Sequence, residues 1–469
     1  MRFVNRIREL GHLEAEYKDI RAKCIVIYGR RRVGKTRLIE EFLKNKSHAG
    51  YYLAAQESDI QQIEEFKSVI YSLIHDEFLR QNKFTDWKHL FTYLEKIWPR
   101  ETRIVLAIDE VTFIIKSNPS FTSYLQKFWD ECLSKTKTIL ILSGSLVGLM
   151  LSEVLGHASP LYGRRTSQIQ VETLHFKEMR DFVANRSFKE QLEYYALVGG
   201  VPKYVLLISP QETIEQFIMT KCFSPEGFFY QEGLFLVSQE FREPSVYMNI
   251  LKAIAFGHTK LNEIANFTGI EGKKISSYMD VLIELGFARR EVPITEDPAR
   301  YRGAIYLLAD NFLSFWHRFI FPGRSKIELH EEKVLYTEKK KEIAEFIAKK
   351  FEEICRQFVR KVYAYERVGK WWGYYRNEVQ KRIEIEVDIC AIDRKQKKLL
   401  VGECKWSDNV KAVSLLSELE RKAQYIEWNK SSRKVEYVLF ARSFVDKDKL
   451  KNRGDVTVFD LEDLEKKWK

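Results

Sequence analysis

A chain of 469 residues is too long for one ordinary domain, and this length favours about three domains. The formal net charge of +11 favours polyanionic partners such as nucleic acid, although lysine on solvated helix surfaces would give the same excess. Six scattered cysteines, no apolar run of ~18 residues and no signal-peptide pattern together predict a reduced, cytoplasmic chain without a membrane span.

The first third of the chain predicts a phosphate-binding loop. The apolar run at residues 24–28 predicts a buried strand, and residues 37–43 have the spacing of a helix. Between them, backbone N–H groups of a glycine-containing loop would approach the phosphates of ATP at the start of the helix. Lys35 is expected to reach the β- and γ-phosphates, and Thr36 is expected to hold Mg²⁺. The predicted nucleotide-binding residues of the loop are Gly29, Arg30, Arg31, Arg32, Val33, Gly34, Lys35 and Thr36.

A second apolar strand, at residues 103–108, ends in Asp109 and Glu110. A carboxylate at the end of a buried strand is costly unless it has a function. We predict that Asp109 binds Mg²⁺ through water and that Glu110 is the general base for the attacking water. Helix capping by Asp109 is the competing interpretation, and the preceding phosphate-binding loop argues against it.

A third strand, at residues 138–142, is followed by Ser143 and Ser145. A polar residue at this strand end would lie near the γ-phosphate, and either serine fits; Ser143 is included in the predicted nucleotide site. The pair Arg164 and Arg165 follows a loop further on. One of the two is expected to supply positive charge to the transition state, as an arginine finger does, and a solvated basic pair is the alternative.

These motifs, with Phe-Val-Asn-Arg-Ile-Arg-Glu-Leu at residues 3–10 and Gly-Gly-Val-Pro-Lys-Tyr at residues 199–204, resemble the archaeal ATPase family. That family is a STAND-type branch of the P-loop ATPases, related to AAA+ and Orc/Cdc6 proteins. The resemblance covers most of residues 1–240. It implies an ATPase core over residues 1–175 and a three-helix lid over residues 176–240. It also implies that the first motif, with Arg6 and Glu9, lies near the base and ribose of the nucleotide.

Residues 245–292 predict three helices and a strand, and residues 304–308 predict a returning strand. This order is typical of a winged helix-turn-helix, whose third helix can enter the major groove of DNA. We assign residues 241–325 to this module and to an aromatic linker that follows it. Packing against the ATPase as a structural arm is the alternative, as in STAND-type proteins. The residues expected to face DNA phosphates are Lys273, Lys274, Ser276, Ser277, Arg289, Arg290, Arg300 and Arg302.

The last domain, residues 326–469, carries a second candidate site. Asp388 lies on a predicted strand, and Glu403-x-Lys405 lies on the next strand across a hairpin. This is the arrangement of PD-(D/E)xK nucleases, and residues two apart on a strand share one face. We predict that Asp388 and Glu403 hold Mg²⁺, with Glu352 on the preceding helix as a further ligand and Glu353 as its alternative.

In that site Lys405 would position the attacking water or balance transition-state charge during phosphodiester cleavage. So short a motif also occurs by chance on solvated strand edges, but the residues around Glu403 are apolar. The aromatic linker at residues 307–319 resembles that of a subset of the archaeal ATPase family whose C-terminal domain is catalogued as of unknown function.

The predicted architecture is α/β: a P-loop NTPase with a parallel sheet, a helical lid, a winged helix-turn-helix and a C-terminal restriction-endonuclease-like domain. The predicted function is ATP-controlled DNA processing with Mg²⁺-dependent DNA cleavage. The alternative is a STAND-type regulatory switch whose last two domains only bind DNA or protein partners. The sequence is compatible with a homo-oligomer and gives no DNA preference or pathway.

Overall fold

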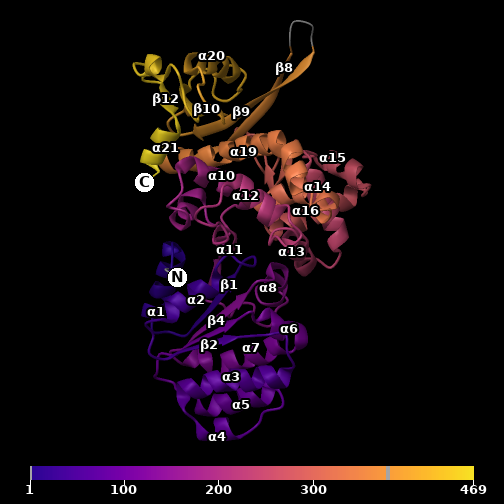
Figure 1. Cartoon of the computed structure of the whole chain (residues 1–469). Helices are drawn as coiled ribbons and strands as arrows, with labels where there is room; N and C mark the ends of the chain where they lie inside the picture. Colours follow the sequence, from indigo (N-terminus) through magenta and orange to yellow (C-terminus); the bar gives the residue numbers. More distant parts are fainter. Residues whose placement is uncertain (1–2, 377–380, 469) are drawn as a thin grey trace. The chain divides into compact units, whose positions relative to one another are not determined.

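The computed structural model describes residues 3–376 and 381–468 (Figure 1). The chain divides into two units. The first is Met1–Thr173 with Val201–Lys203, and the second is Leu174–Gly200 with Tyr204–Lys469. The predicted end of the ATPase core at residue 175 is close to the first change of unit. The later predicted boundaries, at residues 240 and 325, both fall within the second unit.

The first unit is built on a five-stranded parallel sheet of order β2-β3-β4-β1-β5. The strands are β1 (Lys23–Tyr28), β2 (Ala49–Leu53), β3 (Val105–Asp109), β4 (Ile139–Gly144) and β5 (Ser167–Gln170). β1, β3 and β4 are buried along almost their whole length, as expected for strands covered on both faces. Because all strands run in parallel, the carboxyl ends of β1, β3 and β4 meet at one edge of the sheet.

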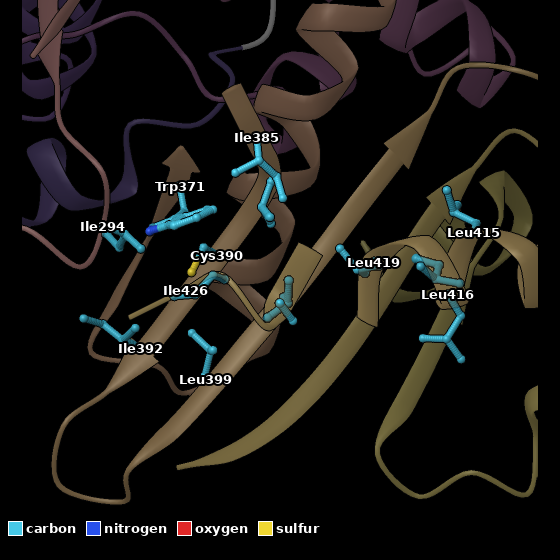
Figure 2. Packing of buried hydrophobic residues seen from close by; sticks show 14 of the residues in the cluster. Ile294, Trp371, Ile385, Cys390, Ile392, Leu399, Leu415, Leu416, Leu419 and Ile426 are labelled. Carbon is cyan, nitrogen blue, oxygen red and sulfur yellow. The ribbon is translucent and has the colours of Figure 1, made fainter. Parts of the chain in front are cut away.

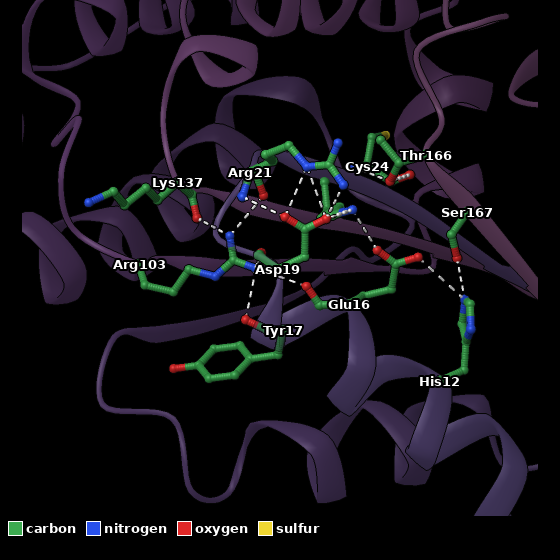
Figure 3. Close-up of polar contacts among 11 residues, drawn as sticks. His12, Glu16, Tyr17, Asp19, Arg21, Cys24, Arg103, Lys137, Thr166 and Ser167 are labelled. Atoms are coloured by element: carbon green, nitrogen blue, oxygen red, sulfur yellow. Dashed lines mark hydrogen bonds and ion pairs between the residues drawn. The ribbon is translucent and has the colours of Figure 1, made fainter.

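Helices connect these strands within the first unit (Figure 1). They are α1 (Ile7–Lys18), α2 (Lys35–Leu43), α3 (Asp59–Ile74), α4 (Glu77–Gln81), α5 (Trp87–Ile97), α6 (Thr112–Ser117), α7 (Phe121–Glu131) and α8 (Val147–Glu153). Arg103, just before β3, fixes the end of α1 (Figure 3). Its guanidinium donates to the main-chain oxygens of Glu16, Tyr17, Asp19, Arg21 and Lys137. The last carbonyls of a helix have no partner inside it, so Arg103 satisfies those of α1.

The second unit begins with helices that pack onto the aromatic linker. They are α9 (Phe176–Met179), α10 (Phe188–Val198), α11 (Pro202–Val205), α12 (Ile214–Phe217) and α13 (Glu232–Glu240), and the first two residues of α11 belong to the first unit. The linker forms α17 (Asn311–Phe315) and the π-helix η4 (Trp316–Ile320). The Asn311 side-chain amide donates to the main-chain oxygen of Tyr195 at 2.9 Å. The Trp316 indole N–H donates to the main-chain oxygen of Tyr230 at 3.0 Å. The linker aromatics Phe312, Phe315, Trp316 and Phe319 are buried and are therefore core residues.

Three helices and an antiparallel hairpin follow α13. They are α14 (Pro244–Ala255), α15 (Leu261–Thr268), α16 (Gly272–Glu284), β6 (Ala288–Glu291) and β7 (Ile305–Leu308). This group, called the helix–hairpin module below, has the element order that was predicted. The prediction that Arg289 faces DNA phosphates is wrong, because its guanidinium is bonded to the carboxylates of Glu291 and Glu353, both at 2.9 Å. Arg290 donates to two main-chain oxygens of the hairpin loop, whereas Arg300 is exposed.

The C-terminal part of the second unit is a mixed sheet of order β12-β11-β10-β9-β8. Its strands are β8 (Arg367–Arg376), β9 (Arg382–Asp393), β10 (Lys398–Lys405), β11 (Lys434–Ala441) and β12 (Val456–Phe459). β8, β9 and β10 are antiparallel, and β10, β11 and β12 are parallel. Its helices are α18 (Arg324–Glu328), α19 (Glu332–Val362), α20 (Ala412–Ala423) and α21 (Leu461–Lys467). Leucines of α20 and apolar residues of β8, β9 and β10 form one core cluster (Figure 2).

Within the described residues, no helix has both the length and the apolar character needed to cross a membrane.

One buried histidine should make the stability of the folded protein depend on pH. His317 of η4 is fully buried, and neither ring nitrogen has a hydrogen-bond partner in the part of the chain that the structure describes. Burial, together with the positive charge of Lys252, lowers the pKa of His317 to about 3. The unfolded chain takes up this proton below about pH 6.5, so the folded state loses stability as the pH falls from about 6.5 toward 3.

We therefore expect His317→Phe to flatten the acid side of the stability curve. The wild-type protein should lose up to ~1.4 kcal/mol of unfolding free energy per pH unit more than the variant over that range. Denaturant unfolding at pH 7, 6, 5 and 4 measures this difference. Parallel pH profiles for the two proteins would contradict the assignment.

Candidate functional site

The loop between β1 and α2 is shaped to receive phosphate. Gly29 has a φ of +152°, and a Cβ at this position would lie 2.3 Å from the Val171 oxygen, so only glycine fits. Gly34, at the helix N-cap, also has a positive φ of 98°. The Lys35 ammonium donates to the oxygens of Gly29 at 2.8 Å and Arg30 at 3.2 Å. The lysine is 5% exposed, so its charge is held at the mouth of the loop.

The end of β3 places Asp109 beside this loop. Asp109 is fully buried, and its Oδ2 accepts from the Thr36 hydroxyl at 2.7 Å and from the Tyr51 hydroxyl at 2.9 Å. Its Oδ1 accepts from the Glu110 N–H at 3.0 Å. Two hard oxygen donors, Thr36 and Asp109, are thus in contact, which fits the ligand chemistry of Mg²⁺. The structure brings these two predicted ligands together. It also adds Tyr51 of β2, which belongs to no recognisable motif.

Glu110 adopts an unusual backbone conformation at the same edge. Its φ of +53° lies in the left-handed region, which a non-glycine residue occupies only with strain. Its carboxylate accepts from the Ser145 hydroxyl at 2.7 Å and from the Ser145 N–H at 3.2 Å. The Ser143 hydroxyl is fully buried and has no hydrogen-bond partner within the described residues. Of the two candidate serines, Ser145 is thus bonded to Glu110, and Ser143 has a hydroxyl available to a ligand.

The three predicted arginines have different partners. Arg6 is buried and donates to the Val33 oxygen at 2.9 Å, so it supports the loop backbone. Arg164 pairs with Asp130 at 3.0 Å on the surface. Burial raises the pKa of the Tyr28 hydroxyl at the end of β1, and the positive charge of Arg165 acts in the opposite direction. The Arg165 guanidinium donates to the main-chain oxygen of Leu155 at 3.2 Å.

The C-terminal candidate site is centred on a β-bulge. Gly369 of β8 pairs with Cys390 of β9, and Trp371 pairs with Val387. Two residues of β9, Asp388 and Ile389, therefore lie opposite the single residue Lys370 of β8. Bulges are frequent next to active sites, where they re-aim a side chain. The Asp388 Oδ2 accepts from the Cys404 N–H at 2.9 Å.

Glu352 of α19 lies near Asp388, as predicted. Burial and the Asp388 carboxylate raise the pKa of Glu352 to about 7. Burial and the Glu403 carboxylate raise the pKa of Asp388. Asp388 thus lies close to two other carboxylates, and such a cluster of negative charge is typical of a cation site before the cation binds. Glu353, the alternative ligand, is instead bonded to Arg289 and Lys350, at 2.9 and 3.3 Å.

Glu403 is buried between two lysines. Its carboxylate lies 2.9 Å from the Lys405 ammonium and 2.9 Å from the Lys422 ammonium of α20. Lys422 belongs to no motif and is not among the predicted site residues. Within residues 3–376 and 381–468, no group of three or more His, Cys, Asp or Glu side chains is placed to hold one metal ion. Mg²⁺ commonly uses only one or two carboxylates and keeps several waters, so Asp388 with one neighbour still fits it.

Asp388 and Glu352 open into a cleft of about 440 Å³. One wall comes from α19, β8 and β9, with Lys370 and Trp372 among its residues. The other wall comes from the helix–hairpin module. Lys370 pairs with Glu386 on the first wall and lies 3.9 Å from Glu352.

Comparison with known families identifies two segments of the chain. Residues 3–208 match the model of an ATPase domain predominantly from Archaea. Residues 316–422 match a model described as archaeal and bacterial proteins of unknown function.

Individual relatives extend this similarity. An uncharacterized protein of Methanocaldococcus jannaschii is 32% identical over 470 residues, which cover 98% of this chain and 100% of that protein. An uncharacterized ATP-binding protein of Pyrococcus horikoshii is 26% identical over 240 residues, which cover 44% of this chain and 73% of that protein. Among solved structures, a Walker-type ATPase of Pyrococcus abyssi is similar with a TM-score of 0.47 and 18% identity, covering 67% of this chain and 96% of that one.

Proposed function

Because this chain belongs to the archaeal ATPase family, we propose that it is an ATP-driven DNA-processing protein whose C-terminal site cleaves DNA with Mg²⁺. The ATPase half is a P-loop ATPase by family and by its parallel sheet. The observation that carries the second half is the bulge that aims Asp388 into a cleft beside Glu352 and Glu403.

In the ATPase site, Lys35 binds the β- and γ-phosphates, and Thr36 and Asp109 hold Mg²⁺, which neutralises phosphate charge when bound. Glu110 accepts a proton from the attacking water. Ser143 contacts the γ-phosphate, and Arg165 supplies positive charge in the transition state. Support for the last two roles is the partnerless Ser143 hydroxyl and the effect of Arg165 on the end of β1.

Glu110→Gln is expected to bind ATP and to turn it over ~10²- to 10⁴-fold more slowly. The amide oxygen of glutamine can still accept from the Ser145 hydroxyl, so the backbone and the site geometry are retained while the base is lost. Phosphate release and equilibrium binding of labelled ATP measure the two effects. Turnover at the wild-type rate would exclude Glu110 as the base.

Tyr51→Phe tests a positioning residue for Mg²⁺. The tyrosine hydroxyl donates to the same Asp109 oxygen as Thr36, so its loss should loosen that carboxylate. We expect the Mg²⁺ concentration for half-maximal ATPase to rise about tenfold, the effect of one hydrogen bond to a charged group. Tyr52→Phe is the matched control, because its hydroxyl has no partner among the described residues. An unchanged Mg²⁺ dependence in Tyr51→Phe would exclude the role.

In the C-terminal site, Asp388 with Glu352 or Glu403 holds Mg²⁺, which would activate water and stabilise the leaving oxygen of a phosphodiester. Lys405 is placed to balance transition-state charge. Lys422 holds the Glu403 carboxylate in place when Lys405 turns to the substrate. The positive charge of the chain and the helix–hairpin module support DNA as the partner.

A regulatory switch that only binds DNA is the second candidate. It is favoured by the absence, among the described residues, of three metal-binding side chains placed around one ion. In that case ATP would change partner binding and no DNA would be cut.

A nuclease assay decides between the two. Linear, nicked, single-stranded and branched DNA are each incubated with Mg²⁺ or Mn²⁺, and with ATP, a non-hydrolysable analogue or no nucleotide. Cleavage of any form supports the nuclease, and a dependence on nucleotide supports control by the ATPase. If no form is cut under any condition, the C-terminal domain is a binding domain.

A further inference from the structure

We infer that the C-terminal site acts on unpaired nucleotides, at a strand end or in a single-stranded segment, because the helix–hairpin module closes its cleft to duplex DNA. This inference rests on the proposed nuclease function and names the substrate form of that site.

The cleft has two walls, and only one belongs to the nuclease-like sheet. Glu352 and Asp388 lie on that wall. Thr259 and Lys260, at the start of α15, and Leu307 of β7 lie on the other wall. A substrate phosphate that reaches Asp388 through this cleft therefore passes between the sheet and the module.

The volume of this cleft limits what can enter. About 440 Å³ lies within the range of cavities that enclose a single small ligand, ~300 to 1,000 Å³. One nucleotide fits such a space, and two paired strands with their backbones do not. Enzymes that act on paired nucleotides in a narrow pocket must first unstack them, which favours substrate that is already unpaired.

The second wall is fixed to the first by polar contacts. The Ile294 N–H, in the loop of the hairpin, donates to the Lys370 oxygen of β8 at 2.9 Å. β8 is an edge strand, so this bond covers an edge that would otherwise be open. Arg289 of β6 is bonded to Glu353 of α19. Burial opposes the charge of Arg289, but the carboxylates of Glu353 and Glu291 overcome this and raise the pKa of the guanidinium.

Apolar packing also holds this wall. Ile294 is 7% exposed and belongs to the same core cluster as Trp371 and Ile385 of the sheet (Figure 2). A Cβ at Gly369 would come within 2.9 Å of the Ile294 side chain, so the hairpin loop lies directly on β8. The wall is thus part of a packed core and not a mobile lid.

The charge of the cleft adds a condition for entry. More carboxylates than cationic side chains line it, and Lys370 is already paired with Glu386. An anionic strand is repelled from such a cleft until a divalent cation neutralises Asp388 and Glu352. Entry of the strand should therefore require Mg²⁺ or Mn²⁺.

The test compares the full-length protein on three matched, end-labelled substrates: a duplex with a single-stranded overhang, the same duplex with blunt ends, and a covalently closed duplex circle. With Mg²⁺ and ATP we expect the overhang to be cut at least ~100-fold faster than the blunt duplex, and the circle to stay intact. Equal rates on all three would overturn this inference and leave the nuclease function standing. Cleavage of no substrate would overturn both.

A variant of the wall tests the cause of the preference. Arg289→Ala removes the ion pair to Glu353, and Ile294→Ala removes the apolar contact with β8; each should raise duplex cleavage and reduce the preference at least fivefold. Glu296→Ala, in the exposed loop of the same hairpin, is the control and should keep the wild-type preference. A preference unchanged in folded Arg289→Ala and Ile294→Ala would overturn the role of the wall. If either variant does not fold, the three-substrate comparison of the wild-type protein still decides.

Discussion

Lys35→Ala is expected to abolish ATP hydrolysis, with a loss of at least ~100-fold in the turnover rate. In the structure the ammonium group lies at the mouth of the loop, bonded to the oxygens of Gly29 and Arg30. Phosphate oxygens would replace these neutral acceptors, and positive charge in a buried site stabilises the charge on the transferring phosphoryl group. Alanine leaves the negative charge of the phosphoryl group without this positive partner.

The measurement is steady-state phosphate release, together with the dissociation constant for ATP. Lys44→Ala is the matched control, because Lys44 follows the last turn of the same helix and its side chain is paired on the surface with Glu41. Thermal unfolding of both variants shows whether the first unit is intact. Normal turnover in Lys35→Ala would exclude an ATPase at this loop, and equal losses in both variants would indicate a folding defect.

The ATPase site could be predicted because its chemistry lies in local patterns. Each ligand follows a strand that is apolar along its length, and such strands are recognised without knowledge of the fold. Lys35, Asp109 and Ser143 are each found at the end of one of these strands or at the start of the helix that follows. Parallel strands bring their carboxyl ends to one edge of the sheet. Motifs that directly follow such strands could therefore be predicted to lie close together.

Residues that act across the fold could not be predicted in this way. Tyr51 reaches Asp109 because β2 and β3 are neighbours in the sheet, and the pattern around Tyr51 does not state which strand it pairs with. Lys422 reaches Glu403 from a helix that follows β10, with no fixed spacing between them. Long side chains on amphipathic helices usually indicate a solvated face, so no signal distinguished this lysine from others on α20.

The error at Arg289 has a similar cause. Its place on a hairpin strand is typical of an arginine that faces DNA, and only one of its two carboxylate partners, Glu291, is near it in the sequence. The other partner, Glu353, is more than sixty residues away on α19, and the same carboxylate had been considered as a metal ligand. One partly buried ion pair therefore removes a candidate from each of the two sites. The edge strand β8 was also missed, since its aromatic residues are interrupted by Gly369 and Gly373.

Asp388→Asn is expected to remove metal-dependent DNA cleavage, by at least ~100-fold, and to leave ATP hydrolysis at the wild-type rate. Asparagine keeps an oxygen that can accept from the Cys404 N–H, so the bulge retains its hydrogen bond. What is lost is one negative charge, which is the property that a divalent cation requires. Cleavage of labelled DNA and phosphate release, measured on one preparation, separate the two activities.

The same variant should be at least as stable as the wild-type protein when metal is chelated. Asp388 is half-buried beside the carboxylates of Glu352 and Glu403, so a neutral side chain relieves repulsion between like charges. Replacing a residue that only supports the fold would lower the stability of the protein. Replacing a metal ligand in this way would lower its activity and raise its stability. Asp393→Asn, at the end of the same strand, is the control and should change neither cleavage nor ATPase turnover. Undiminished cleavage by Asp388→Asn would exclude this aspartate from the site, and a loss of stability in place of activity would assign it a structural role.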